Sequence, residues 1–423
     1  MKQWRHPQVS TQAELSPYLS ADSLSLAQRL KQLPAVSKDT NFIAAIEESN
    51  ALPIPNDLAI SIHVPDELET GVSYQKWALP MIDQLKGLST YFDKDRQIQE
   101  LQVQIKTSQP VQTLVRHLVN RIDAHFKIAS DAKLTISVPI GIEQFEVIDS
   151  HHTFSHLHID YVISVDDIKH IEAAWIKRQR IANCSIGLAL DLSATAQHDF
   201  KHSSAPLREM IWLGGDRITF ESLTTRTPCY KNALSSIPDL NELLEELEQN
   251  QYHPIGSGIF AKTSCPLAQA YLPDELGLGI NGFLVQSKLD QIGIGLGAAS
   301  LISDYVALNH ANVAEYFQDI SQRKFPIGHG MTLSKDDVIR QVVISELLCH
   351  YSLPIDKIQR RFGICFKQHF HNQHEQLKQM QFNGLLTKHR DTLEVTDQGL
   401  SQVSQIAALF SSPIRSQQPH RIV

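Results

Sequence analysis

The sequence contains few cysteines, and none of them lie close together. Its 423 residues include only Cys184, Cys229, Cys265, Cys349 and Cys365. The closest pair is sixteen residues apart, so the sequence has no C-x2-C motif or similar metal-binding spacing. An odd, scattered set of this kind is typical of buried free thiols in a reducing compartment.

Long hydrophobic runs are also absent. The most apolar stretch, residues 292–302, is too short and too interrupted by glycine to span a bilayer. Residues 1–7 contain no apolar core of the kind found in signal peptides. The net charge of −8 argues against a general binder of nucleic acids or anionic membranes. We therefore expect a cytoplasmic protein with no membrane span and no nucleic-acid partner.

The composition is that of an ordinary globular protein, with 42% hydrophobic and 20% charged residues. Short β-rich runs alternate with amphipathic stretches of helical periodicity, which predicts parallel strands joined by right-handed crossovers. The six runs cover residues 58–64, 101–105, 134–138, 159–164, 184–190 and 217–223. We therefore predict an α/β fold whose main part is a partial (βα)6-type parallel barrel.

The C-terminal region has the pattern of a winged-helix module. Ser334 is followed three residues later by Asp337, which is the spacing of a capping box at the start of a helix. Further helices are predicted over residues 354–362 and 365–382, and two short strands flank a turn at 388–391. Such a module could bind DNA, but the acidic chain lacks the electrostatic footprint of a DNA-binding protein. A packing or lid module is therefore favoured.

These patterns divide the chain into three parts. We predict an N-terminal helical arm over residues 1–55, the partial barrel over 56–300 and a C-terminal helical, winged-helix-like domain over 301–423.

Several segments share residues, in the same order, with one known family. They are DRITF at 216–220, NGFLVQ at 281–286, DQIGIGLGAAS at 290–300, TLSKDDVIR at 332–340, and NGL at 383–385 followed by VTDQG at 395–399. Together they resemble the oxygen-independent coproporphyrinogen III dehydrogenases (oxidases), which are radical S-adenosylmethionine enzymes of haem biosynthesis. The resemblance covers residues 40–423 and implies the same barrel and C-terminal domain.

The resemblance also implies a [4Fe–4S] cluster, held by the thiolates of a C-x3-C-x2-C loop after the first barrel strand. In this chain that loop is DELETGVS at 66–73, which contains no cysteine. Other family positions differ as well. A glycine-rich turn becomes KTSQP at 106–110, where Lys106 and Ser108 would crowd a ligand. A glutamate, a glutamine and an aspartate become Ser137, Asp166 and Gly187. We therefore expect a degenerate paralogue that binds neither the cluster nor S-adenosylmethionine.

Four histidines lie in the stretch DSHHTFSHLH at 149–158. His156 and His158 would lie on one face of a strand, an arrangement compatible with zinc, nickel or haem iron because neutral imidazole binds these metals. The alternative is a solvated loop before a strand, in a chain with 20 histidines. We expect no metal site, and we keep His156 and His158 as the candidates for one.

The resemblance places the NGFLVQ segment beside the family's reaction chamber. Asn281, Gly282, Phe283 and Gln286 are therefore expected on the rim of a cavity that is either vestigial or binds a tetrapyrrole. Phe283 could stack on a flat macrocycle, and the alternative for this residue is a core aromatic. Haem or a porphyrin is the ligand that this arrangement would accept.

Three functions follow from these observations. The expected one is a non-catalytic tetrapyrrole-binding or regulatory protein of the porphyrin and haem biosynthesis family. The second is a working oxidoreductase of porphyrin biosynthesis that uses an unrecognised metal site. The third is a structural partner of a genuine family enzyme.

Overall fold

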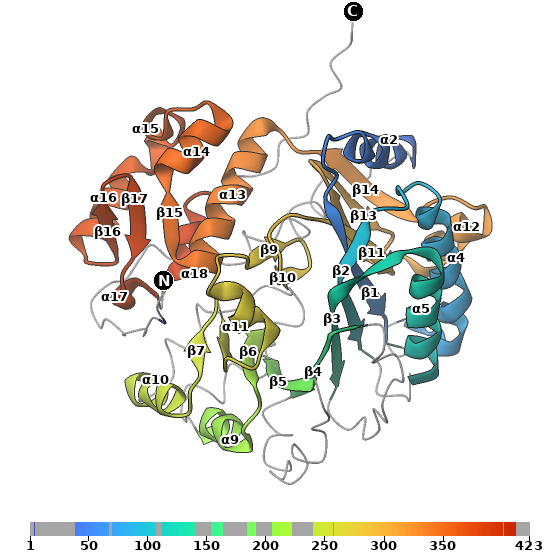
Figure 1. Cartoon of the computed structure of the whole chain (residues 1–423), viewed down its shortest axis with the longest axis horizontal. Coiled ribbons are helices and arrows are strands. Elements are labelled where there is room, and N and C mark those ends of the chain that lie inside the picture. Colours follow the sequence, from blue (N-terminus) through green and yellow to red (C-terminus); the bar gives the residue numbers. More distant parts are fainter. Residues whose placement is uncertain are drawn as a thin grey trace, which may run out of the picture.

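The structure is a computed structural model that describes Trp4 and residues 39–66, 70–106, 112–139, 154–163, 184–191, 205–221, 240–256, 258–400 and 402–411. In these ranges a large sheet is covered by helices on its outer side, and a smaller C-terminal module lies beside it (Figure 1). Asp166, Cys229 and residues 107–110 lie outside the described residues.

The main sheet contains six parallel strands that are adjacent in sequence order. They are β1 (Asp57–Val64), β2 (Gln97–Ile105), β3 (Lys127–Pro139), β4 (His156–Ile163), β5 (Cys184–Asp191) and β6 (Arg217–Glu221). Every strand of the set falls on a predicted run. The prediction of an α/β fold with a partial parallel barrel is therefore confirmed.

Antiparallel strands extend the sheet at both ends. Beside β1 lies β11 (Leu289–Gly295), which is also parallel, and beyond it follow β12 (Ala299–Ile302), β13 (Tyr305–Asn309) and β14 (Ile327–Thr332). Beside β6 lie β8 (Ile259–Ala261) and β7 (His253–Pro254). Because β12–β14 continue the barrel sheet, residues 301–332 pack with the barrel, although the predicted division after residue 300 assigns them to the C-terminal domain.

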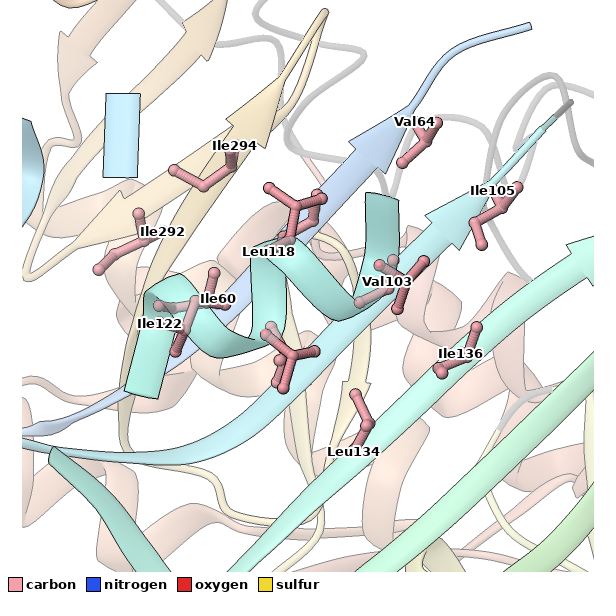
Figure 2. Packing of buried hydrophobic residues seen from close by; sticks show 14 of the residues in the cluster. Ile60, Val64, Val103, Ile105, Leu118, Ile122, Leu134, Ile136, Ile292 and Ile294 are labelled. Carbon is pink, nitrogen blue, oxygen red and sulfur yellow. The ribbon is translucent and has the colours of Figure 1, made fainter. Parts of the chain in front are cut away.

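The outer face of the sheet is apolar because alternate strand residues point to it. Ile60 of β1, Val103 of β2 and Ile136 of β3 are buried there against α5 (Gln112–His125), as Figure 2 shows. The helix contributes an apolar face that includes Leu118 and Ile122. Each such side chain stabilises the fold by about 1.5–3 kcal/mol. Among the described residues, further helices around the sheet are α2 (Asp39–Asn50), η2 (Tyr74–Trp77), α4 (Ala78–Ser89), α9 (Ala205–Leu213), α10 (Leu240–Gln249) and α12 (Val313–Ser321).

The C-terminal module begins with α13 (Lys335–His350), whose predicted capping box is present. The Asp337 amide donates to Ser334 Oγ at 3.2 Å, and the Ser334 amide donates to Asp337 Oδ2 at 3.1 Å. The predicted strands are β16 (Leu386–His389) and β17 (Thr392–Val395), and β15 (Ser352–Pro354) completes a small antiparallel sheet. The module also contains the helices α14 (Ile355–Phe362), α17 (Asp397–Leu400) and α18 (Val403–Ala408).

The predicted helix over 365–382 is interrupted. It consists of α15 (Phe366–His369), the 3-10 turn η5 (His371–Gln373) and α16 (His374–Phe382). Phe370 has φ −106° and ψ 38° between them, and its ring packs on those of Phe366 and Phe410 at 4.7 and 5.0 Å. This tertiary packing breaks the helix, and helical periodicity alone does not reveal it.

The core of the C-terminal module includes residues from an earlier part of the chain. Ile255, Tyr271 and Phe283 are buried in the same hydrophobic cluster as the side chains of α13 and α18. Residues 255–284, the segment that contains these three side chains, also include α11 (Pro266–Tyr271) and the hairpin of β9 (Gly277–Gly279) and β10 (Gly282–Leu284). Residues 255–284 thus join the barrel sheet to the C-terminal core.

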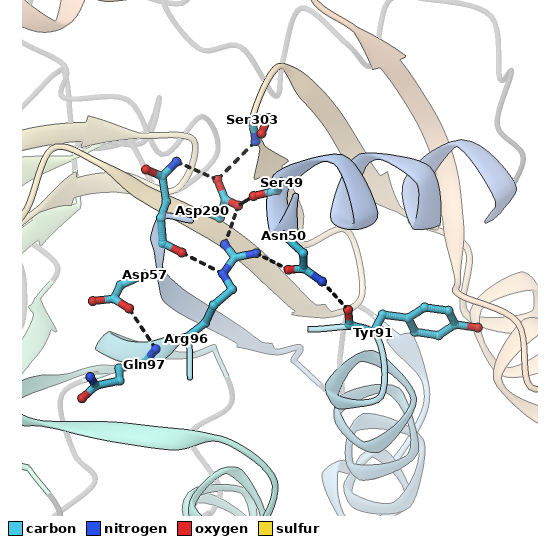
Figure 3. Close-up of polar contacts among 9 residues, drawn as sticks. Ser49, Asn50, Asp57, Tyr91, Arg96, Gln97, Asp290 and Ser303 are labelled. Atoms are coloured by element: carbon cyan, nitrogen blue, oxygen red, sulfur yellow. Dashed lines mark hydrogen bonds and ion pairs between the residues drawn. The ribbon is translucent and has the colours of Figure 1, made fainter. Parts of the chain in front are cut away.

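A buried carboxylate fastens α2 to the barrel. Asp290 of β11 accepts hydrogen bonds from the Ser49 hydroxyl, from Asn56 Nδ2 at 3.3 Å and from the Ser303 amide at 3.2 Å. It also forms an ion pair of 2.5 Å with Arg96 (Figure 3). Four separate segments therefore meet at one side chain.

Within the described part of the chain, no helix has the length and hydrophobicity needed to cross a membrane.

Candidate functional site

The inner face of the barrel is polar, in contrast to the outer face. Ser61 and His63 of β1, His158 and Asp160 of β4, and Arg217 of β6 alternate with the apolar outward residues and are all buried. Buried polar groups require partners. The hydrogen bonds among these side chains therefore show what the barrel interior can do.

The centre of the interior is an ion pair between Asp160 and Arg217. Arg217 Nη2 contacts Asp160 Oδ2, and Arg217 Nε donates to Asp160 Oδ1 at 3.2 Å. Burial by itself raises the pKa of Asp160, but the charge of Arg217 and the hydrogen bonds from His158 and Arg217 outweigh it and hold that pKa well below its usual range. Asp160 is therefore an ionised partner for the arginine and has no proton to donate.

His158 links this pair to two further side chains. His158 Nε2 lies 2.9 Å from Asp160 Oδ1, and His158 Nδ1 lies 2.6 Å from Ser185 Oγ. His156 Nε2 lies 2.8 Å from the same hydroxyl. Burial lowers the pKa of His158, and it lowers that of His156 to about 4. Neutral His158 thus donates from Nε2 to the carboxylate and accepts at Nδ1 from Ser185, which in turn accepts from His156.

The contacts from Ser185 through His158 to Asp160 have the order of a catalytic triad. A triad needs a nucleophile that substrate can reach, and both Ser185 and His158 are only 1% exposed. Asp160 is also paired with Arg217. The arrangement therefore satisfies buried polar groups and does not form a hydrolytic site.

The candidate metal ligands, His156 and His158, do lie on the same face of β4 as predicted. Their nitrogens are directed to Ser185 and Asp160. Among the described residues, no three histidine, cysteine, aspartate or glutamate side chains are grouped as a metal site. A metal role for the two histidines stays a prediction.

A second buried carboxylate connects the barrel to the NGFLVQ segment. Glu100 of β2 accepts from the Val285 amide at 2.9 Å and from Gln102 Nε2 at 2.7 Å. Gln102 Nε2 also donates to the Phe283 carbonyl at 3.3 Å. Burial raises the pKa of Glu100, and the two hydrogen bonds and the charge of Arg217 oppose that shift. Glu100 thus anchors the predicted cavity rim to the second strand.

The four predicted rim residues lie together but face different neighbours. Asn281 Nδ2 donates to the Ala299 carbonyl at 2.9 Å, and Gln286 Nε2 lies 3.5 Å from Gln99 Oε1. Gly282 has a positive φ of 126°, a conformation that glycine adopts readily. Phe283 is 8% exposed and belongs to the C-terminal core. Its burial favours the core alternative, and a ligand-binding role for the set stays a prediction.

The loop after β1 offers no ligands for an iron–sulfur cluster. The Thr70 amide and hydroxyl both donate to the Asp66 carbonyl, at 3.2 and 2.9 Å, and the Val72 amide donates to Thr70 Oγ1 at 3.3 Å. Carboxylates and hydroxyls do not replace the thiolates that such clusters need. The residues present therefore do not fit a [4Fe–4S] cluster.

The described cysteines lie outside this loop. Of the four that the structure describes, Cys265 and Cys349 are buried, Cys184 is half-buried and Cys365 is exposed. Burial raises the pKa of the Cys265 thiol, so it does not favour a thiolate.

The positions that the family resemblance marked as altered can be placed in the barrel. Ser137 and Gly187 are in register with Asp160, on either side of it. A Cβ atom at Gly187 would collide with Asp160 Oδ1 and would lie 2.8 Å from His158 Nε2. The space for an aspartate at position 187 is thus taken by Asp160. Lys106 is exposed just beyond β2, and its amide donates to the Val64 carbonyl at 3.1 Å.

Asp160, Arg217 and Glu100 were not predicted as site residues. The sequence signal that could have indicated them is the period-two alternation of polar and apolar residues, as in HLHIDY at 156–161 and QELQVQ at 99–104.

Comparisons with known proteins show what this chain is similar to. Residues 333–401 match the HemN C-terminal domain family. The proteins named oxygen-independent coproporphyrinogen III oxidase from Synechocystis and Thermostichus vulcanus are 28% and 29% identical over 257 and 250 residues. These alignments cover 57% and 56% of this chain, and 54% and 76% of the two relatives. The relative from Helicobacter pylori J99 is 31% identical over 43% of this chain and 40% of its own. The matched stretch thus spans about half the length of the first of these relatives.

A solved structure shares the fold over nearly the whole chain. It is the coproporphyrinogen III oxidase HemN from Escherichia coli, described as a radical SAM enzyme, with a TM-score of 0.72 and 19% identity. The alignment covers 90% of this chain and 95% of that one. One solved structure therefore matches the barrel and the C-terminal module together.

Proposed function

We propose that this chain, a relative of the oxygen-independent coproporphyrinogen III oxidases as the sequence resemblance predicted, is a cytoplasmic protein that binds a tetrapyrrole without radical chemistry. A regulatory or carrier role follows from such binding. The observation that carries the proposal is the loop after β1, where Asp66 and Thr70 stand in place of cluster ligands.

The barrel interior supports the loss of cofactor chemistry. Asp160, Arg217, His158 and Ser185 bond to one another inside the barrel. Gly187 cannot regain a longer side chain beside them without displacing Asp160. When bound, a [4Fe–4S] cluster would supply the electron for radical chemistry, and the loop after β1 offers no thiolate to hold it.

Iron–sulfur reconstitution tests the first half of the proposal. After anaerobic incubation with iron and sulfide and desalting, we expect no [4Fe–4S] absorption and no cleavage of S-adenosylmethionine, because the loop supplies no thiolate. The oxidase from Escherichia coli, treated in parallel, shows that the procedure works. The Cys365→Ser variant removes the exposed thiol and so identifies iron held loosely there. Stoichiometric iron and sulfide retained by the unmodified chain would contradict the proposal.

Titration with coproporphyrin III and with haem tests the second half. We expect saturable binding that weakens up to about tenfold in Phe283→Ala, since an aromatic contact contributes about 0.5–1.5 kcal/mol. Phe382→Ala is the matched control, because that ring is 87% exposed on α16. Phe283→Leu keeps apolar volume and separates stacking from loss of core packing. If neither tetrapyrrole binds, the structural-partner function becomes the better explanation.

A further inference from the structure

A groove of about 850 Å³ lies on the outside of the barrel. One wall is α4 and the turn that follows it, and the other is α12 and the segment that leads to β14. Both helices lie at the same edge of the molecule in Figure 1, on the outer side of the sheet. The groove is therefore separate from the barrel interior.

The base of the groove is apolar and largely aromatic. Phe317 packs on Trp77 at 4.8 Å, and Phe325 meets the ring of Tyr91 edge-on at 5.6 Å. Leu79, on the wall, is 73% exposed. An apolar surface of this kind, left in water within a concave site, is typical of a binding site.

The sides of the groove are basic although the chain as a whole is acidic. Lys76, Lys86, Arg323 and Lys324 line it, and Asp83 is the one acidic side chain among its lining residues. All four basic residues are exposed, and none has a side-chain hydrogen bond or ion pair within the described part of the chain. The net charge of the whole protein is −8. The groove thus concentrates positive charge beside aromatic rings.

We propose that this groove binds a small anionic amphipathic ligand, with a flat apolar body and two or more carboxylate or phosphate groups. The body would pack on Phe317 and Phe325, and the anionic groups would pair with the lysines and Arg323. The volume of about 850 Å³ lies in the range of small-molecule sites, about 300–1,000 Å³. The site goes beyond the proposed function, because it lies outside the barrel.

Gly87 provides a way to close the groove without changing its charge. It lies within α4, where glycine is a poor helix former. A Cβ atom there would lie 3.6 Å from Phe325 Cε1, an ordinary contact, so alanine fits. A leucine would project beside Phe325 into the space that a ligand needs.

The test is equilibrium titration with two probes, coproporphyrin III for carboxylates and ATP for phosphates. We expect at least one to bind and its affinity to fall about tenfold in the Lys86→Glu/Lys324→Glu variant, and also in Gly87→Leu. Raised salt should weaken binding, because the charges are exposed. The controls are Lys367→Glu/Lys388→Glu, which makes the same charge change in the C-terminal module, and Gly87→Ala. Both should bind like the unmodified protein, and thermal unfolding shows that each variant is folded.

The outcomes separate this site from the barrel. Binding of coproporphyrin III that depends on Lys86 and Lys324 but not on Phe283 supports the groove and identifies carboxylates as its ligand groups. Binding of ATP alone with the same dependence supports the groove and identifies phosphates. Binding that depends on Phe283 alone overturns the groove and leaves the proposed function intact. Failure of both probes to bind also overturns it.

Discussion

Replacing Asp290 with alanine should lower the free energy of unfolding by about 3–5 kcal/mol, because it leaves the buried guanidinium of Arg96 without its counter-charge. The same change removes the acceptor for the Ser49 hydroxyl, Asn56 Nδ2 and the Ser303 amide. Denaturant unfolding, followed by circular dichroism, measures the loss.

Two further variants test whether the loss of stability comes from breaking a buried ion pair. Asp356→Ala removes an exposed partner of Arg360 and should cost less than about 1 kcal/mol. The double variant Arg96→Met/Asp290→Ala should be more stable than the sum of the two single losses indicates, because no unpaired charge remains. If Asp290→Ala costs no more than Asp356→Ala, the carboxylate does not fasten α2 to the barrel.

The barrel could be predicted because its strands carry their own signal. Each run of apolar residues marks the buried centre of a strand, and the structure places all six side by side. The first and last residues of the strands could be predicted less well. β3 begins at Lys127, seven residues before the predicted run, because Lys127 and Ile128 pair with β2 ahead of a shift in register, and such an irregular start carries no regular apolar pattern.

The absence of thiolates from the loop after β1 can be read from residue identity alone, because no packing converts the side chains of Asp66 and Thr70 into thiolates. The interior network could not be predicted in this way. Asp160 and Arg217 stand 57 residues apart, and only the register of three neighbouring strands brings them together. Asp290 lies in one of the segments that resemble the family, but its hydrogen bonds and ion pair could not be predicted, because its partners come from distant parts of the chain.

Replacing Gly187 with alanine should cost about 3 kcal/mol, the upper part of the usual range for overpacking a core. The new Cβ would collide with Asp160 Oδ1, which cannot move away without breaking its contacts with Arg217 and His158. The same alanine in an Asp160→Ala background should cost less, since the atom nearest the new Cβ is gone and His158 Nε2, 2.8 Å from that Cβ, is no longer held by the carboxylate. Unfolding of the four proteins of this cycle measures the coupling. Gly87→Ala on α4 is the matched control and should be neutral or stabilising, because its Cβ meets only an ordinary contact. If Gly187→Ala costs the same with and without Asp160, then Asp160 does not occupy the space of a longer side chain at position 187. The aspartate that the family resemblance places at position 187 could then be restored.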